Sequence, residues 1–229
     1  MHVPDGFLDA ATSLATGAVA AVGVAGALRG ARRELDDRTA PLAGLVATFL
    51  FAAQMLNFPV AAGTSGHLLG GTLAAVLVGP CTATLCLTVV LAVQALLFAD
   101  GGLTALGTNI TLMALVGVWV GYAAFLAARR LLPRRVASLP WAAAVGAAVS
   151  VPAAALVFAG LFALGGTVPV PLGTLVVAMG GVHALIGVGE AAITALVVGA
   201  VVGVRPDLVH GARPLRRPIA TTHPAGVGR

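Results

Sequence analysis

The first two residues of the chain, Met1 and His2, are able to chelate a metal ion by themselves. Bacterial methionine removal requires a small second residue, so Met1 should remain with a free amine in front of His2. The Met1 amine, the His2 main-chain nitrogen and the His2 ring nitrogen Nδ1 close a five-membered and a six-membered ring on one ion. These nitrogens occupy three corners of a square, which suits Ni(II) or Cu(II) once the amide loses its proton. The alternative is that His2 is merely an exposed residue near a terminus.

A fourth nitrogen is available from His67, which lies in the stretch GTSGHLLGG. The topology argued below places His67 and the N-terminus on the same side of a membrane. Glycines flank His67 and let main chain approach it closely. We therefore predict a metal site built from Met1, His2 and His67, with Ser65 of the same stretch as a supporting residue.

Two further ionisable residues, His183 and Glu190, share roughly one face of the last long apolar run. Glu190 is a charged side chain deep in an apolar run, where ionisable groups are costly and usually functional. The pair could support the metal site or make a polar contact that fixes its helix. The alternative is a buried pair that serves only packing.

Polar residues frame the segments expected on the side of the N-terminus. Asp100 or Asn109 could orient a ligand imidazole, since a ligating histidine usually gives its other N–H to an oxygen acceptor. The alternative is that Asp100 ends one helix and Asn109 begins the next as a cap, and for Asp100 we favour this alternative. Asn57 could either support the site or end another helix. His210 and His223 lie in a basic tail, where no metal role is expected.

The composition of the chain requires a membrane. Of 229 residues, 59% are hydrophobic and only 9% are charged, whereas a soluble domain has about a quarter charged residues. A spanning helix needs roughly 20 apolar residues. The sequence predicts an all-α integral membrane protein with seven transmembrane helices, over residues 9–28, 41–57, 66–80, 82–98, 109–128, 141–163 and 172–203.

Arginine clusters indicate how these helices are oriented. The formal net charge is +5, and the clusters follow the first, fifth and seventh predicted spans: Arg29, Arg32, Arg33 and Arg38; Arg129, Arg130, Arg134 and Arg135; Arg205, Arg213, Arg216 and Arg217. With seven spans all three clusters fall on one side, which is the cytoplasm by the positive-inside rule. The N-terminus is then outside and the C-terminus cytoplasmic. The start of the chain also lacks the positive charge of a cleavable signal.

The predicted organisation is one membrane domain and one tail. Residues 1–204 form the membrane domain, and residues 205–229 are expected to be a basic, Pro-rich, disordered cytoplasmic tail. The chain has no P-loop, kinase signature or nucleophile elbow, so it is not expected to be an enzyme or to hydrolyse ATP itself.

Four stretches, MHVPDGFL, NFPVAAGTSGHLLGG, ADGGLTALGTN and GVHALIGVGEAAIT, resemble the CbiM/NikM family from Met1 to about Val204. These are substrate-binding membrane components of energy-coupling-factor (ECF) transporters of the ABC type, which supply cobalt, for cobalamin biosynthesis, or nickel. The resemblance implies a seven-helix fold in the bacterial or archaeal cytoplasmic membrane, with the N-terminus inserted into the protein from outside. It also implies Ni²⁺ or Co²⁺ as transported substrate, held by Met1, His2 and His67, and no organic cofactor.

The same resemblance implies partners. They are a transmembrane coupling component, cytoplasmic ABC-type ATPases and a small accessory membrane subunit in some systems. Pro4, Asp5 and Gly6 look more like the start of nickel members than of cobalt members, without settling the metal. Two other functions stay open: a proton-coupled secondary transporter that uses His183 and Glu190, and a membrane metal sensor that does not transport.

Overall fold

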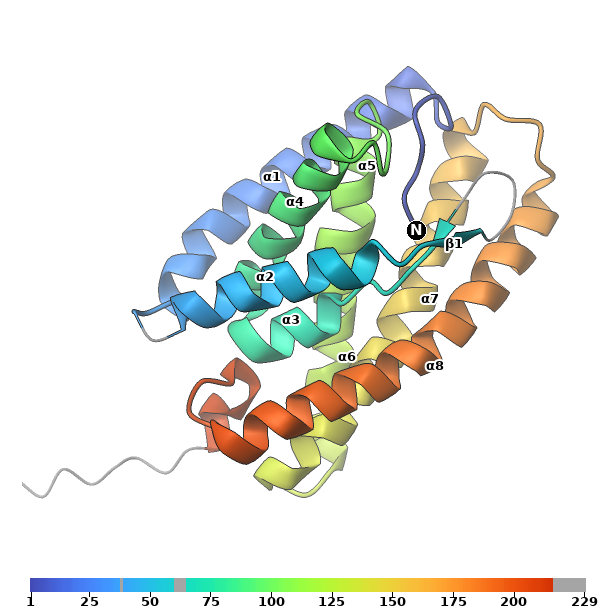
Figure 1. The fold of residues 1–229 in the computed structure, drawn as a ribbon. Coiled ribbons are helices and arrows are strands. Elements are labelled where there is room, and N and C mark those ends of the chain that lie inside the picture. Colours follow the sequence, from blue (N-terminus) through green and yellow to red (C-terminus); the bar gives the residue numbers. More distant parts are fainter. Residues whose placement is uncertain (38, 60–64, 216–229) are drawn as a thin grey trace, which may run out of the picture.

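The computed structural model describes residues 1–37, 39–59 and 65–215, apart from the side chains of residues 58, 59 and 65. It is a bundle of helices around a short central helix, α3 (Figure 1). In chain order the elements are α1 Ala10–Glu34, α2 Ala40–Gln54, β1 Phe58–Pro59, β2 Ser65–Gly66, α3 Gly71–Val78, α4 Pro80–Leu97, α5 Leu106–Asn109, η1 Ile110–Gly117, α6 Val118–Leu131, η2 Val136–Ser138, α7 Leu139–Gly165, α8 Leu172–Val204 and η3 His210–Leu215.

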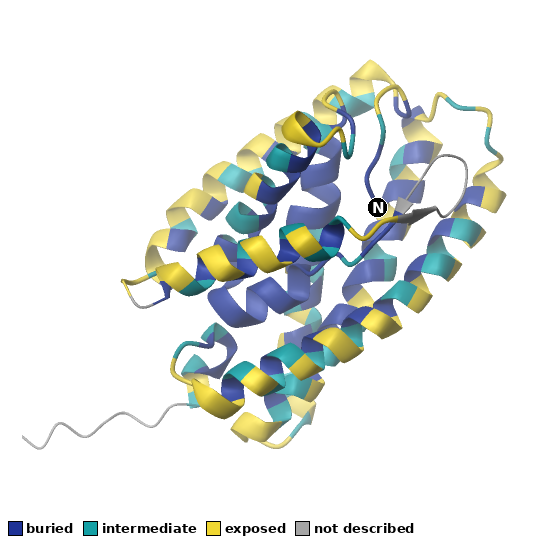
Figure 2. Ribbon diagram, viewed as in Figure 1, coloured by how far each residue is buried: buried dark blue, intermediate teal, exposed yellow. Residues whose placement is uncertain are grey.

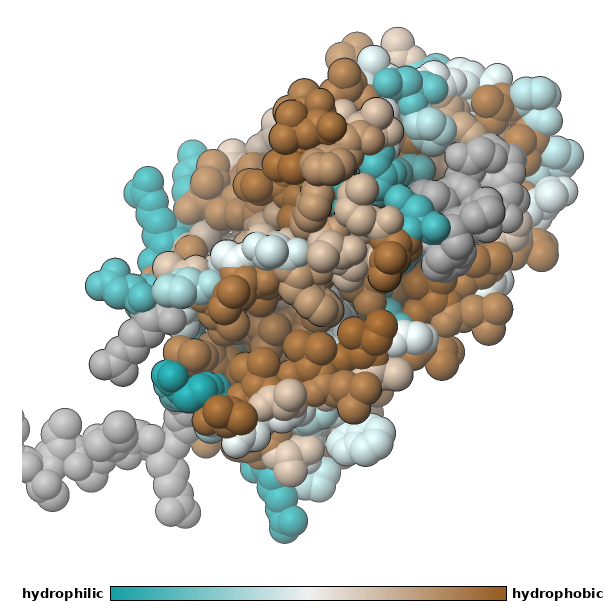
Figure 3. Space-filling model, viewed as in Figure 1, coloured by the Kyte–Doolittle hydropathy of each residue, from teal (hydrophilic) through white to brown (hydrophobic). Residues whose placement is uncertain are grey.

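The outside of the bundle is apolar and its core is made by α3. Every residue of α3 is buried, and α3 contacts α2, α4, α6, α7 and α8. Outward-facing side chains such as Val22, Leu185 and Leu196 are at least 74% exposed, and Figure 2 shows exposed residues along the outer faces of α1, α2 and α8. Figure 3 shows hydrophobic residues over these helices and hydrophilic ones toward the two ends. A surface of this kind is stable only in lipid.

Five helical segments within the described residues are long and apolar enough to cross a membrane: Ala10–Glu34, Pro80–Leu97, Leu106–Leu131, Val136–Gly165 and Leu172–Val204. The shorter apolar helix α2 occupies the second predicted span. The prediction of an all-α integral membrane protein is confirmed.

The helix predicted over residues 66–80 is shorter than expected. Only Gly71–Val78 is helical, which corresponds to about 12 Å, far less than the roughly 30 Å of a bilayer core. Residues 65 and 66 pair instead with residues 59 and 58 in a two-residue antiparallel ladder, and Gly70 adopts a left-handed conformation with φ 75°. His67 therefore sits in non-helical main chain, which is tolerated at this depth because protein surrounds it.

A continuous helix from Leu106 to Leu131 packs beside α3. Its middle part, η1, is a π-helix, a form that often marks functional sites. Gly71 at the start of α3 approaches this helix so closely that a Cβ atom would lie 2.9 Å from the carbonyl carbon of Gly117. A side chain at position 71 would push α3 away from the site described below.

The beginning of the tail is folded, contrary to the prediction of disorder over 205–229. Residues 205–215 turn back on the bundle, where Val209 and Ala212 are buried. Gly211 packs against Phe125 and Val76, and its carbonyl accepts a hydrogen bond from Arg129 at 3.1 Å. The apolar residues within the basic tail explain why it folds. Residues 216–229, with His223, lie outside the described residues.

Contacts of the tail also show that the arginine clusters share one end of the bundle. Arg213 donates a hydrogen bond to the carbonyl of Glu34, at the end of α1, at 2.6 Å. Arg129, at the end of α6, contacts the same tail. We call this the basic end. The N-terminus and the loops 98–105 and 166–171 belong to the opposite half of the molecule (Figure 1).

Candidate metal site

Residues 1–9, which we call the N-terminal strap, run back into the bundle instead of extending into solvent. Figure 1 shows the N-terminus beside β1, inside the circle of helices. Met1 and Val3 are each 1% exposed and His2 is 5% exposed. A short apolar sequence beginning with Met-His has thus become part of the core.

Hydrogen bonds to two loops fix the outer part of the strap. Asp5 accepts hydrogen bonds from the main-chain N–H, at 2.7 Å, and the hydroxyl of Thr104. Thr167 donates its main-chain N–H to the Phe7 carbonyl at 3.2 Å and its hydroxyl to the Gly6 carbonyl. The hydrogen bond with the Thr104 side chain lowers the pKa of Asp5, so this anchor is ionised at neutral pH.

The inner part of the strap is held at Val3. The Asn109 side chain accepts a hydrogen bond from the Val3 main-chain N–H at 2.8 Å and donates one to the Val3 carbonyl at 3.2 Å. Gly102 donates to the same carbonyl at 3.0 Å. The predicted role of Asn109 was to orient an imidazole; the structure shows it binding the main chain next to His2 instead.

The ring of His2 lies between two polar side chains. Its Nε2 is 3.1 Å from Gln94 Oε1, and its Nδ1 is 3.1 Å from Asp100 Oδ1. Asn57 donates to the other Asp100 oxygen at 2.8 Å. Expecting Asp100 only to end a helix was wrong, because its carboxylate faces His2. Burial acts to raise the pKa of Asp100, but the contacts with His2 and Asn57 prevail and the pKa is lowered.

His67 faces His2 directly. The two rings stack with centroids 4.5 Å apart at an interplanar angle of 29°, and His67 is fully buried. Nδ1 of His67 lies 2.8 Å from the carbonyl oxygen of Leu68, which can only accept a hydrogen bond, so Nδ1 carries the proton. Nε2 then has a free lone pair, and it has no hydrogen-bond partner among the described residues. A buried nitrogen of this kind is suited to a metal ion.

The main chain that carries His67 is fixed from α8 and α2. Glu190 accepts hydrogen bonds from the main-chain N–H groups of Leu69 at 2.7 Å and Gly70 at 3.0 Å. Gln54 donates to the Leu69 carbonyl at 2.8 Å. Glu190 therefore replaces the hydrogen bonds that the start of α3 lacks, and holds the segment two residues away from His67.

His183 lies near the site but is bonded separately from Glu190. Its Nδ1 donates to the Met179 carbonyl at 2.9 Å, one turn earlier in α8. Its Nε2 is buried without a hydrogen-bond partner among the described residues.

The Met1 amine is buried with these rings. Burial lowers the pKa of this amine well below its usual range, although the carboxylates of Asp100 and Glu190 act in the opposite direction. The neutral amine is a metal ligand, whereas the ammonium ion is not. Within the described part of the chain no three His, Cys, Asp or Glu side chains gather as a conventional metal cluster.

The structure thus brings together most of the predicted site residues: Met1, His2 and His67, with Asn109, Asn57, His183 and Glu190 around them. The side chain of Ser65 is outside the described residues. His210 lies in η3 at the basic end, away from the site. Sequence reasoning missed Gln94 and Gln54, although each is an amide in an otherwise apolar run, which is itself a signal of a polar site.

Comparisons with known proteins identify the family of the chain. Residues 2–208 match the CbiM family model, described as the cobalt uptake substrate-specific transmembrane region. A relative from Haloquadratum walsbyi, named as a metal transport protein, is 42% identical over 209 residues, covering 91% of this chain and 93% of its own. A relative from Archaeoglobus fulgidus, named as a fused nickel transport protein NikMN, is 40% identical and is covered over 68% of its length.

Solved structures show the same fold. A crystal structure of a truncated transition metal transporter superimposes with a TM-score of 0.82 at 32% identity, over 89% of this chain and 99% of that one. A second transition metal transporter gives a TM-score of 0.81 at 34% identity, over 89% and 93% of the two chains. The chain is therefore a multi-pass membrane protein of prokaryotic cobalt or nickel transport and belongs to the CbiM family.

Proposed function

We propose that this chain is the substrate-capture component of an ATP-driven ECF-type importer for Ni²⁺ or Co²⁺. The metal is bound by the Met1 amine, the deprotonated amide and Nδ1 of His2, and Nε2 of His67. The observation that carries the proposal is the burial of the N-terminal strap. It stacks the ring of His2 on the ring of His67, whose Nε2 carries no proton and has no hydrogen-bond partner among the described residues.

The chemistry of the donor set favours nickel. Four nitrogens, one of them a deprotonated amide, suit a metal that prefers tetragonal coordination, whereas Zn²⁺ prefers tetrahedral sites and Mg²⁺ or Ca²⁺ prefers oxygen. To bind the metal, His2 must release the contact of Nδ1 with Asp100, while Nε2 keeps Gln94 as its hydrogen-bond partner. Asp100 remains ionised beside the bound cation and offsets part of its charge.

Binding should be coupled to transport by other chains. The basic end, with the arginine clusters, faces the cytoplasm by the positive-inside rule. A transmembrane coupling component and cytoplasmic ABC-type ATPases, with a small accessory membrane subunit where the system has one, would supply the energy, since the sequence of this chain contains no P-loop.

The separate bonding of His183 and Glu190 argues against the proton-coupled alternative. A relay through the pair needs exchange between the two side chains, but His183 is bonded to the Met179 carbonyl and Glu190 to the N–H groups of Leu69 and Gly70. Transport measurements distinguish the other alternative, a membrane metal sensor, from the proposed importer.

The first test is a titration of the purified protein with Ni²⁺ and Co²⁺, followed by absorbance in the d–d region. Intact mass must first show that Met1 is the terminal residue. We expect a saturable one-to-one square-planar nickel band, which disappears in His2→Ala, in His67→Ala and in a protein with one glycine added before Met1. A glycine added after Arg229 is the matched control. An unchanged band in the N-terminally extended protein would eliminate the chelate.

The second test addresses the partners. Uptake of nickel is measured in cells that lack their own importers, with this chain alone, with the coupling component and ATPases, and with ATPases that cannot hydrolyse ATP. We expect uptake only when this chain is present together with the coupling component and active ATPases. Uptake by the chain alone, following the proton gradient, would support the secondary transporter. Binding without uptake in any case would support the sensor.

A further inference from the structure

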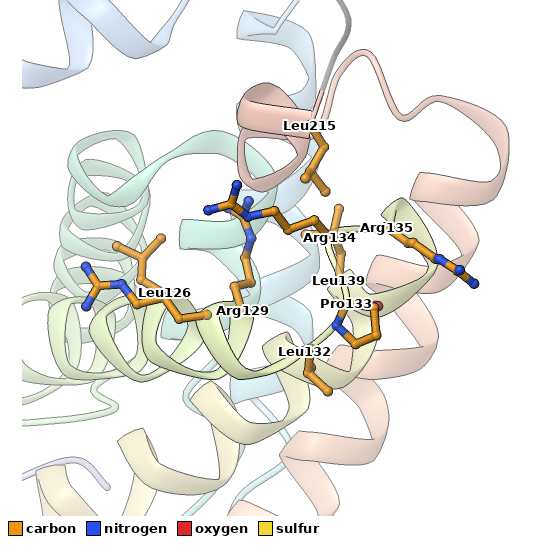
Figure 4. Close-up of a pocket in the computed structure, with 10 residues that line it drawn as sticks. Leu126, Arg129, Leu132, Pro133, Arg134, Arg135, Leu139 and Leu215 are labelled. Carbon is orange, nitrogen blue, oxygen red and sulfur yellow. The ribbon is translucent and has the colours of Figure 1, made fainter.

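A pocket of about 210 Å³ opens at the basic end of the bundle, between the end of α6 and the start of α7 (Figure 4). Four arginines and four leucines contribute to its lining, with Pro133 and Ser138 between them: Leu126, Arg129, Arg130, Leu132, Arg134, Arg135, Leu139 and Leu215. The pocket is remote from His2 and His67 and plays no part in the metal site.

Within residues 1–37, 39–59 and 65–215 no ion pair includes an arginine of this pocket. Arg129 is held in place by its hydrogen bond to the Gly211 carbonyl and by the ring of Phe125, 5.5 Å from its guanidinium carbon. In Figure 4 Arg134 extends toward the Arg129 guanidinium, whereas Arg135 points away. Such a cluster attracts an anion.

The start of α7 adds a second source of positive potential. Ser138 is its N-cap residue and lines the pocket, but its hydroxyl makes no capping hydrogen bond. The helix extends over 27 residues from this point, so the positive end of its dipole lies at the pocket. A helix N-terminus next to guanidinium groups is an arrangement that binds phosphate.

The apolar lining identifies which phosphate compound fits. Leu126, which lines the pocket, is 38% exposed, and Leu131 at the end of the same helix is 88% exposed, so apolar side chains of α6 are exposed at the level of the pocket. Trp141, one residue after Pro140 in α7, is 69% exposed, as expected of an aromatic residue at a membrane interface. A soluble anion would use the arginines and leave the leucines without partners.

We propose that this pocket binds the phosphate group of one anionic phospholipid, such as phosphatidylglycerol, with its acyl chains along the leucines of α6. Arginine clusters between transmembrane helices on the cytoplasmic side are typical binding sites for anionic headgroups. Leu215 of the tail lines the same pocket and Arg129 also binds Gly211. The bound lipid therefore ties α6, α7 and the folded start of the tail to the inner leaflet.

The test uses the full chain, stripped of lipid in detergent and titrated with phosphatidylglycerol or phosphatidylcholine under native mass spectrometry. We expect one phosphatidylglycerol to bind in preference to phosphatidylcholine. The variant Arg130→Gln/Arg134→Gln should weaken the binding of phosphatidylglycerol roughly tenfold. The control, Arg32→Gln/Arg33→Gln, removes the same charge from the exposed end of α1 and should change binding by less than about twofold. Nickel binding by both variants establishes that they are folded.

Three outcomes would overturn the proposal. Equal losses in the pocket and control variants would mean that the arginines act only as general surface charge. Displacement of phosphatidylglycerol by glycerol phosphate at equal concentration would mean that the pocket takes a soluble phosphate ester. Binding of an acidic peptide with no preference for anionic lipid would mean that the pocket is a protein docking site.

Discussion

Asn109 binds both main-chain polar groups of Val3, accepting from its N–H at 2.8 Å and donating to its carbonyl at 3.2 Å. The side chain therefore acts as a neighbouring strand would, although it comes from a helix start 106 residues away. Because His2 directly precedes Val3, this pair of bonds fixes the depth and direction of the Met-His dipeptide.

The first prediction concerns this pair of bonds. Asn109→Leu keeps the branching of the side chain, though not its volume, and leaves the Val3 N–H without a partner, so the chelating residues lose their fixed position. We expect nickel affinity to fall about 10- to 100-fold, as is typical when residues that orient ligands are replaced. The fall should be measured by competition with a chromophoric chelator.

The matched control is Asn109→Asp. A carboxylate still accepts from the Val3 N–H but cannot donate to its carbonyl, which Gly102 continues to satisfy. The affinity of this variant should lie between those of Asn109→Leu and the unaltered protein. If Asn109→Leu bound nickel normally, the strap would not depend on Asn109.

The second prediction concerns Glu190. Glu190→Gln replaces one acceptor oxygen by an NH₂ group that faces a main-chain N–H, so one buried donor loses its partner. A buried unsatisfied group costs about 1–3 kcal/mol. We expect a lower Tm in detergent with a smaller change in nickel affinity, because Glu190 holds the main chain at residues 69 and 70 and does not touch the metal.

Thr194→Val is the control for that experiment. Thr194 lies one turn further along α8, is fully buried, and its hydroxyl has no hydrogen-bond partner among the described residues. Its replacement should leave Tm unchanged or raise it. A large loss of affinity in a well-folded Glu190→Gln protein would instead place Glu190 in contact with the metal.

The third prediction concerns protons released when nickel binds. Because burial lowers the pKa of the Met1 amine well below its usual range, the amine holds fewer protons at a given pH than an exposed terminal amine does. In the free peptide Met-His-Val the amine has an ordinary pKa near 8 and is largely protonated at that pH. The protein should therefore release fewer protons per nickel ion than the peptide.

Nickel affinity should also depend less on pH in the protein than in the peptide. As pH falls from 8 to 6, protons compete with nickel less effectively at the buried amine, whose pKa is lowered, than at the peptide amine, so affinity should decline less steeply for the protein. Calorimetry in buffers of different ionisation enthalpy counts the protons directly. Equal proton release by protein and peptide would show that the amine is exposed or protonated in the protein.

Much of this architecture could be predicted because a bilayer permits few kinds of backbone structure. Long apolar runs must be helices there. The arginine clusters at 29–38, 129–135 and 205–217 indicated a common end of the bundle. The hydrogen bonds of Arg129 to Gly211 in the folded tail, and of Arg213 in that tail to Glu34 of α1, confirm it. The proximity of His2 and His67 was expected from sidedness. Their depth inside the bundle was expected only from the family resemblance.

The predictions that were wrong concern details that depend on contacts between residues far apart in the sequence. Nothing near Asp100 in the sequence indicates that it faces His2, because the strap that brings them together begins almost a hundred residues earlier. The short α3 was hidden because residues 68–80 are apolar apart from Thr72, and hydropathy does not distinguish a helix from buried extended chain. Likewise, Val209 and Ala212 fold the tail by packing under α3, a surface that exists only once the bundle has formed.

The last prediction concerns Gly101, which lies against the metal site with a φ of 86°. A Cβ atom here would lie 3.0 Å from Asn109 Nδ2 and 3.1 Å from His2 Cδ2. Gly101→Ala should therefore strain the main chain and also displace both the ring of His2 and the side chain that holds Val3. We expect nickel affinity to fall at least as far as in Asn109→Leu, by about 10-fold or more.

Gly6→Ala separates these two effects. Gly6 also has a positive φ, of 71°, but a Cβ atom added there has nothing within 4 Å. The substitution carries the conformational penalty alone, about 1 kcal/mol or slightly more, and should lower Tm while nickel still binds tightly. Measured side by side, a selective loss of affinity in Gly101→Ala shows that close packing at residue 101 positions His2. Equal behaviour of the two variants would show that only main-chain strain matters and that the ring of His2 is free to move.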